Sequence, residues 1–206
     1  MMQNKFLFGI TGGSGTGKST VSGMFRALGI EVVDCDAVAR YVTEKGMPCL
    51  GELEAEFGSC IIGEDGALLR RKLGELVFSH PEKLERLNEI THRYIIAEVL
   101  KRIENSPGKM AGIDGAVLFE SGVTEKCGAV IGVLAPRSLR IERITQRDGI
   151  SRESAQKRID SQKNDDFYLE NCDIILYNDG NMKELESSVK EVVSKLENRI
   201  YGKDTV

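Results

Sequence analysis

Residues Gly12 to Ser19 read GGSGTGKS and match the pattern G-x-x-x-x-G-K-[ST] at every fixed position. The apolar run Phe6 to Ile10 precedes them, and helical spacing begins at Lys18. In such a strand-loop-helix, glycines let backbone N–H groups point at phosphate oxygens, and the helix adds its positive N-terminal end. A glycine-rich turn that binds nothing would explain some of the glycines, but not Gly17, Lys18 and Ser19 together. The stretch therefore predicts a nucleoside triphosphate site.

Separate roles are expected within this phosphate-binding loop. Lys18 is expected to contact the β and γ phosphates, and the Ser19 hydroxyl is expected to bind Mg²⁺. The residues expected to contact the nucleotide here are Gly13, Ser14, Gly15, Thr16, Gly17, Lys18, Ser19 and Thr20.

Composition restricts the class of protein. The 206 residues suit one domain with insertions, and no apolar run approaches the roughly 20 residues of a membrane helix. With no signal peptide evident, we expect a cytoplasmic protein with no membrane partner. The five scattered cysteines indicate neither a zinc site nor a disulfide framework. A net charge of −4 argues against a nucleic-acid partner.

One segment departs from this acidic balance. Residues 137–163 carry eight basic side chains against four acidic ones, which suggests a small polyanionic ligand. Arg140, Arg143 and Arg147 have i, i+3, i+7 spacing and would share one face of a helix that could close over the phosphates. A row of basic side chains is also common on a solvated helix surface. Among the three, Arg147 is favoured for function because Gly149 beside it could act as a hinge.

Short apolar runs alternate with segments of helical spacing. This alternation predicts a parallel β-sheet covered by helices on both faces, with ligands beyond the carboxyl ends of the strands. The expected strands are Phe6–Ile10, Ile30–Val33, Met110–Ile113, Val130–Leu134 and Ile174–Leu176.

A wholly helical stretch, about 37–108, separates the second and third expected strands and reads as an inserted subdomain. The core is then about 1–36 and 109–206 within a single 1–206 domain. Ser79 to Glu82 resembles a capping box that opens a helix running to about Ile103. We also expect Gly149 to end one helix, Ser151 to begin the next, and Asn181 with Glu184 to cap the last.

Carboxylates follow two of these strands. Asp34 and Asp36 come directly after Ile30–Val33, where a carboxylate could accept a proton from an attacking hydroxyl or organise Mg²⁺. The alternative is a helix N-cap, and Asp36 is favoured over Asp34 for catalysis. Asp114 follows Met110–Ile113 and is a candidate for holding a Mg²⁺ water, or else a turn former.

Two residues of the predicted helical insertion are candidates for substrate contact. His92 lies on the long inserted helix, and Arg70 begins another one. Each also has an ordinary interpretation, as a packed or surface histidine and as an exposed cation.

In order along the chain, several motifs together resemble the dephospho-CoA kinase family over nearly the whole sequence. They are Gly9 to Thr20, Val33 to Asp36, Gly66 to Arg70, Val77-Phe78, Asp114 to Glu120, Arg147 to Gly149, Arg158-Ile159 with Gln162, and Asn178 to Gly180. The later motifs are individually weak, and their order and spacing carry the resemblance.

The resemblance implies ATP- and Mg²⁺-dependent phosphorylation of the ribose 3′-hydroxyl of dephospho-CoA. It implies that Asp36 activates this hydroxyl and that Lys18 and Arg147 stabilise the transferring phosphoryl group. The helical insertion would bind dephospho-CoA with Arg70 and His92, and residues 137–163 would form a lid. Asn178 and Gly180 would border the adenine of the nucleotide.

Two positions depart from the family pattern. Arg93 stands where the family usually has proline, and so does Ala116. Both departures concern the pose of the acceptor more than the reaction.

Three other functions would also use a phosphate-binding loop. A regulatory GTPase should carry [NT]-K-x-D, and the nearest string begins with Gln162. A non-catalytic nucleotide-binding module would leave the strand-end carboxylates without a purpose. Another small-molecule kinase, for a nucleoside or nucleotide, is the main alternative. The expected assembly is a monomer or a weak homo-oligomer.

Overall fold

The computed structural model describes residues 5–116, 118–119 and 122–202. These fall into two compact units. Unit 1 comprises the described residues up to Val32 and from Ser106 onward, and unit 2 comprises Val33–Asn105. In the described part of the chain, no helix is both long enough and apolar enough to cross a membrane.

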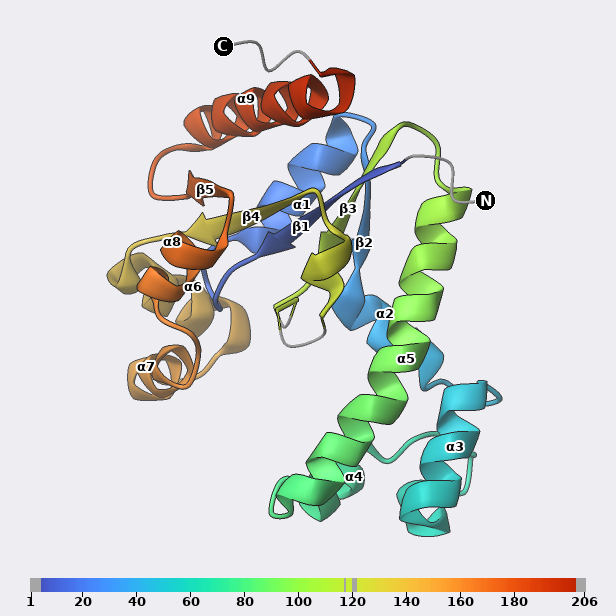
Figure 1. Ribbon diagram of the computed structural model, residues 1–206. Coiled ribbons are helices and arrows are strands. Elements are labelled where there is room, and N and C mark those ends of the chain that lie inside the picture. The colour runs from blue at the N-terminus through green and yellow to red at the C-terminus, as the bar shows by residue number, and fades with distance from the viewer. Residues whose placement is uncertain (1–4, 117, 120–121, 203–206) are drawn as a thin grey trace. The chain divides into compact units, whose positions relative to one another are not determined.

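A five-stranded sheet organises unit 1 (Figure 1). Its order is β2-β3-β1-β4-β5, and the β1–β3, β1–β4 and β4–β5 pairs are parallel. The strand predictions are confirmed to within one residue at each end, although β2 runs across the boundary into unit 2. The strands are β1 (Phe6–Thr11), β2 (Glu31–Asp34), β3 (Met110–Asp114), β4 (Ala129–Leu134) and β5 (Ile174–Tyr177).

Helices α1 (Lys18–Ala27) and α9 (Met182–Tyr201) cover one face of this sheet (Figure 1). Alternate residues of β1, Phe8 and Ile10, are fully buried in the core that these helices close. The other face carries η2 (Val123–Lys126) and α8 (Asp165–Asn171). The central strands are therefore buried on both sides, and only their carboxyl ends offer polar groups for chemistry.

Local signals set the helix ends of unit 1. Asn181 and Glu184 form the expected capping box of α9. Helix α6 (Arg137–Asp148) ends at Gly149, whose φ of 65° is left-handed and suits glycine. The Ser151 side chain accepts from the Ser154 N–H at the start of α7 (Arg152–Asp160), so all three cap predictions are confirmed. Apolar side chains pack α6 against α7, namely Ile141, Ile144, Ala155 and Ile159.

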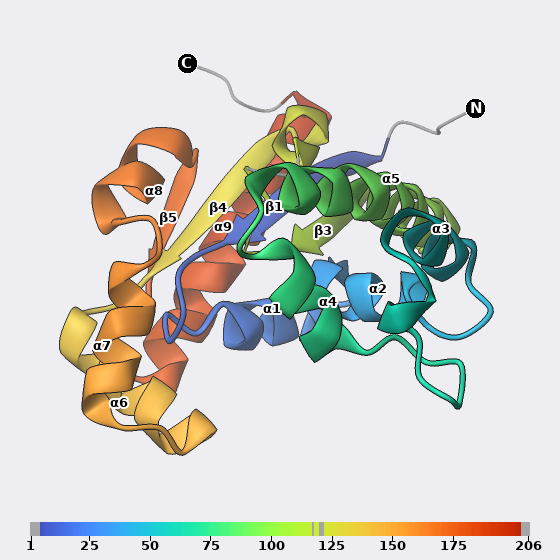
Figure 2. The same ribbon diagram turned by 90° about the horizontal axis from the view of Figure 1, so that it is seen from below.

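Unit 2 is largely helical (Figure 2). Helices α2 (Cys35–Val42), α3 (Pro48–Phe57) and α4 (Arg70–Val77) all pack against α5 (Pro81–Asn105), with η1 (Ser59–Ile61) between α3 and α4 in the chain. The capping box expected at Ser79 is wrong. Helix α5 begins at Pro81, which puts His80 at the N-cap, and the Ser79 hydroxyl lies 3.0 Å from Nδ1 of His80.

Candidate functional site

The phosphate-binding loop lies at the carboxyl end of β1 and leads directly into α1. Gly15 and Gly17 have φ values of 79° and 89°, which side-chain-bearing residues rarely adopt. A Cβ at Gly15 would lie only 2.6 Å from the carbonyl oxygen of Arg140, and one at Gly17 would overlap Nδ2 of Asn178. Because Gly17 is the N-cap and has no side chain, it leaves the positive end of α1 open to an anion.

Lys18 is ion-paired with Asp114 at the end of β3. The other carboxylate oxygen of Asp114 accepts a 2.7 Å hydrogen bond from the Ser22 hydroxyl. Lys18 and Ser22 stand four residues apart and so lie on one face of α1. Asp114 is only 4% exposed, and this pairing satisfies the buried carboxylate. The carboxylate thus fixes the position from which Lys18 would reach a phosphate.

Ser19 and Thr20 are exposed on the first turn of α1. Thr16 is fully buried instead, and its hydroxyl donates to the Gly13 carbonyl at 2.9 Å, so its side chain closes the loop. The described residues contain no cluster of three or more His, Cys, Asp or Glu side chains suited to a metal ion. The Ser19 hydroxyl on the first turn of α1 and the strand-end carboxylate of Asp114 are oxygen donors, which suit Mg²⁺, an ion that keeps several waters and takes other ligands from phosphates.

Ser14, near the tip of the loop, is held through all of its polar groups. Its N–H donates to Oε1 of Gln162 at 2.8 Å, and its hydroxyl accepts from Nε2 of Gln162 at 3.0 Å. Its carbonyl accepts from Nε of Arg140 at 3.0 Å. The loop tip is therefore clamped by side chains that come from the 137–163 segment.

Arg140 is buried, with 3% of its surface exposed. Burial lowers the pKa of its guanidinium, and Asp165, 3.2 Å from Nη1, acts in the opposite direction. Nη2 has no hydrogen-bond partner among the described residues and lies against Gly13, where a Cβ would overlap it. Arg140 therefore supports the loop, and the expectation that its face of α6 closes over the phosphates stays a prediction.

Arg143 and Asn178 complete this support. Arg143 Nη1 donates to the carbonyls of Gly15 and Thr16 at 3.3 and 3.4 Å, and Nη2 donates to Asn178. Asn178 is 8% exposed and donates from Nδ2 to the Thr16 carbonyl at 2.8 Å. The Asn178 side chain thus helps to hold the loop. Its expected position beside the adenine stays a prediction. A Cβ at the neighbouring Gly180 would overlap Oε2 of Glu184.

Sequence reasoning missed the supporting roles of Ser22, Gln162, Arg140 and Arg143. A signal was present, because a tight loop leaves carbonyl groups that need donors from elsewhere in the chain. The arginine spacing on α6 and the position of Gln162 in a motif were visible, but not which loop atoms they would meet.

Arg147 lies at the last turn of α6 and is bound to its neighbour. Its Nε and Nη2 donate to the two carboxylate oxygens of Asp148 at 2.7 and 2.9 Å. Arg158 of α7 also pairs with Asp148. These donors, Arg147 first, hold the pKa of Asp148 at about 2, and Asp148 raises that of Arg147. The side chain of Arg147 remains 62% exposed.

In unit 2, the carboxylates of Asp34, the last residue of β2, and of Asp36 have different environments. Oδ1 of Asp34 accepts from the N–H groups of Asp36 and Ala37 at 2.8 and 3.0 Å and so caps α2. The side chain of Asp36 is on the exposed first turn of the helix. Helix α2 begins at Cys35, so strand alternation does not extend to Asp36. Asp34 fills the capping role, which leaves Asp36 as the candidate base.

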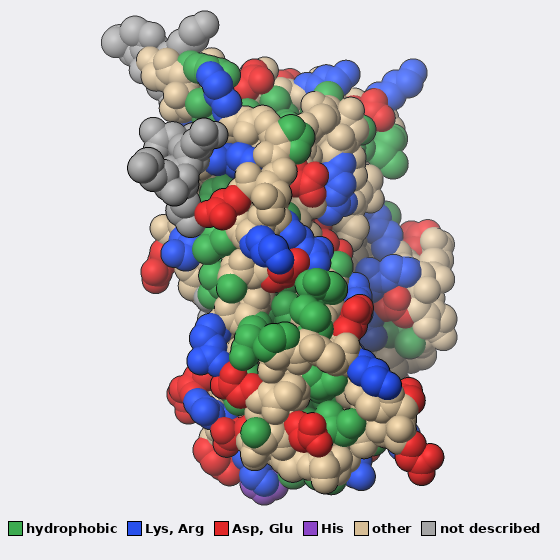
Figure 3. Space-filling view, turned by 90° about the vertical axis from the view of Figure 1, so that its right-hand side faces the viewer, with side chains coloured by type: hydrophobic (Ala, Val, Ile, Leu, Met, Phe, Trp, Pro, Cys, Tyr) green, Lys and Arg blue, Asp and Glu red, His purple; other side chains and the backbone are tan. Residues whose placement is uncertain are grey.

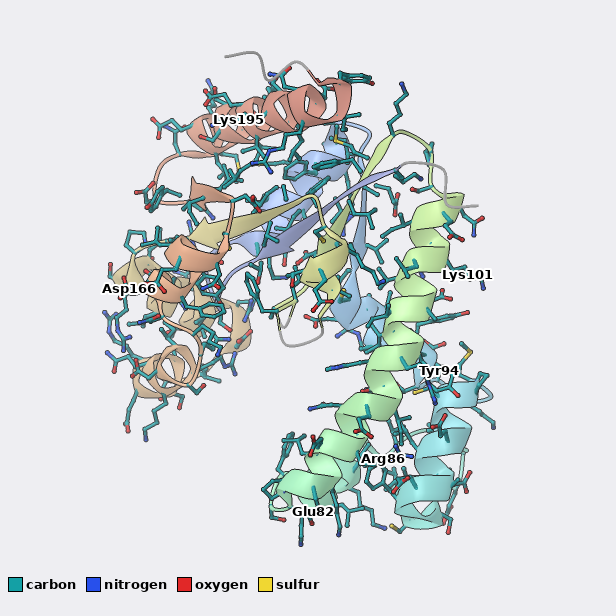
Figure 4. All side chains as sticks on the ribbon, in the orientation of Figure 1. Glu82, Arg86, Tyr94, Lys101, Asp166 and Lys195 are labelled. Carbon is teal, nitrogen blue, oxygen red and sulfur yellow. The ribbon has the colours of Figure 1, made fainter. Side chains whose placement is uncertain are left out.

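Arg70 begins α4, and its Nη2 donates to the Thr43 hydroxyl at 2.7 Å. His92 is half-buried on α5. Arg93, which stands where the family usually has proline, pairs with Glu52 of α3 at 2.5 Å. The Tyr94 hydroxyl donates to the same Glu52 oxygen at 2.8 Å, and Figure 4 labels Tyr94 on the α5 ribbon beside α3. The arginine departure therefore joins two helices of unit 2.

The motif from Asp114 to Glu120 is described only in part. Val117 and Glu120 lie outside the described residues. Ala116, the second departure from the family pattern, is exposed in the turn after β3.

Comparisons with known proteins agree with this arrangement. The family model described as Dephospho-CoA kinase matches residues 6–184. A protein from Enterococcus faecalis named dephospho-CoA kinase is 37% identical over 90% of this chain and 94% of its own.

Solved structures are also similar to this chain in fold. A Thermus thermophilus structure has a TM-score of 0.82 at 31% identity, covering 94% of this chain and 99% of its own. The dephospho-CoA kinase of Campylobacter jejuni has a TM-score of 0.66 at 28% identity, covering 92% and 96% respectively.

Proposed function

The chain belongs to the dephospho-CoA kinase family, and from this premise we propose that it transfers the γ-phosphoryl group of ATP to the ribose 3′-hydroxyl of dephospho-CoA. The observation that carries the proposal is the match over residues 6–184, together with a preformed phosphate cradle at the end of β1. Phosphoryl transfer depends chiefly on positioning the reactants and neutralising charge. The phosphate-binding loop would position the phosphates, and the basic side chains beside it would neutralise their charge.

The nucleotide side of the reaction belongs to unit 1. Backbone N–H groups of the loop and the start of α1 bind the phosphates of ATP. Lys18 moves its ammonium from the Asp114 carboxylate toward the phosphoryl oxygens and neutralises charge as it develops. Arg147 contributes a second positive charge after exchanging its bond with Asp148. Residues 137–163 act as the lid, and Asn178 and Gly180 border the adenine.

The acceptor side of the reaction belongs to unit 2. Asp36 accepts the proton of the 3′-hydroxyl as the oxygen attacks phosphorus, which needs an exposed carboxylate that is not already used as a cap. Arg70, oriented by Thr43, binds an anionic group of dephospho-CoA, and His92 contributes a further contact.

Mg²⁺ would be held by the Ser19 hydroxyl, by phosphate oxygens and, through water, by Asp114, and would neutralise phosphate charge when bound. Replacing Asp114 with Asn removes the charge behind that water. We expect the Mg²⁺ concentration for half-maximal activity to rise roughly 10-fold or more. Ser22→Ala is the control, since it keeps the carboxylate and removes only one hydrogen bond. An unchanged Mg²⁺ dependence in Asp114→Asn would remove this aspartate from the metal site.

We place the enzyme in the cytoplasm as a monomer or weak homo-oligomer, with a small-molecule substrate and no nucleic-acid partner. The net charge of −4 supports the absence of a nucleic-acid partner, and on the face seen in Figure 3 the Lys and Arg side chains are interspersed with Asp and Glu.

An acceptor panel tests the proposal. Purified protein is incubated with ATP, Mg²⁺ and, in separate reactions, dephospho-CoA, adenosine, a pyrimidine nucleoside, a nucleoside monophosphate and shikimate, and ADP release is measured. We expect the highest kcat/KM for dephospho-CoA. Efficient turnover of another acceptor, with none of dephospho-CoA, would favour a different small-molecule kinase.

A further inference from the structure

Helix α8 places a carboxylate against the buried guanidinium that supports the phosphate-binding loop. Oδ1 of Asp165, in the first turn of α8, lies 3.2 Å from Nη1 of Arg140. In the described part of the chain, Asp165 is the only acidic residue that forms an ion pair with Arg140. A buried charge that loses its partner is strongly unfavourable. The position of the Arg140 side chain therefore depends on Asp165.

Arg140 contacts three consecutive residues of the loop. Its Nε donates to the Ser14 carbonyl at 3.0 Å, and a Cβ at Gly13 would overlap its Nη2. A Cβ at Gly15 would lie 2.6 Å from its carbonyl oxygen. If the guanidinium moved out toward solvent, the Ser14 carbonyl would lose this donor and Gly13 would lose the group that it packs against. The loop would then have other conformations open to it.

The short helix that carries Asp165 is itself held in place. The Asn164 side chain caps it by accepting from the Phe167 N–H at 3.0 Å. The Phe167 ring packs edge-on against Phe119, with the ring centroids 5.1 Å apart. Phe119 belongs to the motif from Asp114 to Glu120 that follows β3. The cap and the aromatic contact thus fix α8, so that the Asp165 carboxylate has a defined position before any nucleotide binds.

The next residue provides a natural comparison. Asp166 also lies in the first turn of α8, and Figure 4 labels it there. Its side chain is exposed and forms no hydrogen bond or ion pair with the described residues. Both carboxylates interact favourably with the helix dipole. The two aspartates therefore differ chiefly in the contact of Asp165 with Arg140.

We propose that Asp165 is a positioning residue for nucleotide binding, which holds Arg140 against Gly13 and Ser14 and so keeps the loop in the conformation that receives the triphosphate. The assignment rests on the proposed function for the nature of the ligand. Asp165 acts only through Arg140 and does not touch the phosphates. Because a nucleotide binds only those molecules whose loop has this conformation, its apparent affinity falls in proportion to their fraction.

Calorimetry with a non-hydrolysable ATP analogue tests the assignment. Asp165→Asn should raise the dissociation constant roughly 10-fold, while the KM for dephospho-CoA stays within about two-fold of wild type. Asp166→Asn removes the same charge from the same helix turn, and this matched control should bind the analogue as wild type does. Asp165→Ser should show the same loss as Asp165→Asn and replaces it if the asparagine variant does not fold, which circular dichroism checks.

A double-mutant cycle shows whether Asp165 acts through Arg140. Arg140→Leu should weaken binding at least as much as Asp165→Asn, and adding Asp165→Asn to it should weaken binding no further, because both remove the same support. Wild-type affinity in Asp165→Asn, additive losses in the double variant, or an equal rise in the KM for dephospho-CoA would overturn the assignment. If wild-type protein does not bind the analogue at all, the proposed function fails instead, so the two failures are distinguishable.

Discussion

Asp34 and Asp36 are two residues apart and have different environments. Asp34 accepts two backbone N–H bonds at the start of α2, whereas Asp36 presents an exposed carboxylate in the first turn of the helix. This difference follows from the chain turning into a helix at Cys35. Asp34 therefore caps the helix, and Asp36 is free of that role and is the proposed base.

Replacing Asp36 with Asn should lower kcat at least about 100-fold, because the amide cannot accept the hydroxyl proton. The dissociation constant for ATP should remain unchanged, as measured by calorimetry. Asp34→Asn is the matched control, since asparagine caps a helix as well as aspartate does, and its kcat should stay within a few-fold of wild type. The opposite result, with Asp34→Asn inactive and Asp36→Asn active, would exchange the two roles.

Asp148 links Arg147 and Arg158. Its pKa in the folded protein is about 2, below the ordinary value of 3.8. The pairing therefore contributes stability above about pH 3.8 and loses it as the pH falls through about 2. Carbon-13 NMR of the Asp148 carboxyl should follow this low pKa, and Arg147→Ala should raise it. Arg152→Ala, which removes another cation of α7, should leave it unchanged. A wild-type value near 3.8 would show that the pairing is absent in solution.

Helix α6 and the turn after α7 hold the phosphate-binding loop in place through Arg140, Arg143 and Gln162. Gln162 makes two hydrogen bonds to Ser14, at 2.8 and 3.0 Å. Leucine has a similar size but neither donates nor accepts. Each lost bond is worth about 1 kcal/mol, so Gln162→Leu should raise KM for ATP on the order of 10-fold. The KM for dephospho-CoA should not change.

The control for this variant is Gln146→Leu on α6, where the amide donates to the exposed Glu142 and not to the phosphate-binding loop. It should behave as wild type. Equal increases in the KM of both substrates for Gln162→Leu would indicate general loosening of the structure and would contradict a specific clamp on the loop.

Helices and strands could be predicted where neighbouring residues in the sequence determine them. Apolar runs gave all five strands, and Asn181 with Glu184 gave the start of α9, because both depend on neighbouring residues. The start of α5 was misassigned because proline after His80 makes His80 the N-cap and competes with the Ser79 pattern. The clamp on Ser14 joins residues 148 positions apart, and no local pattern encodes such a contact.

The two units divide the proposed work between a nucleotide-binding sheet and a helical acceptor-binding part. The phosphate-binding loop could be placed from its sequence motif, since that motif implies its own backbone geometry. The acceptor contacts could not, because they depend on how α2, α3 and α4 pack along α5. Arg93 illustrates this, since its ion pair with Glu52 of α3 arises only in the packed unit.

Hydrogen exchange measured by mass spectrometry should resolve this division. A non-hydrolysable ATP analogue should slow exchange in residues 13–20 and 137–163, which belong to unit 1. Dephospho-CoA should slow exchange in unit 2, including α4. Ordered ligand contacts protect amides because they suppress local opening. Protection by the ATP analogue confined to unit 2 would contradict the assignment of the nucleotide site.

The most direct test of the assigned reaction is the position of the new phosphate. The product formed from ATP and dephospho-CoA is purified and its phosphorus-31 and proton NMR spectra are compared with those of authentic CoA. The account predicts a single monophosphate coupled to the ribose 3′ proton. A phosphate at the 2′ position, or no phosphorylated acceptor despite tight binding of ATP, would contradict it.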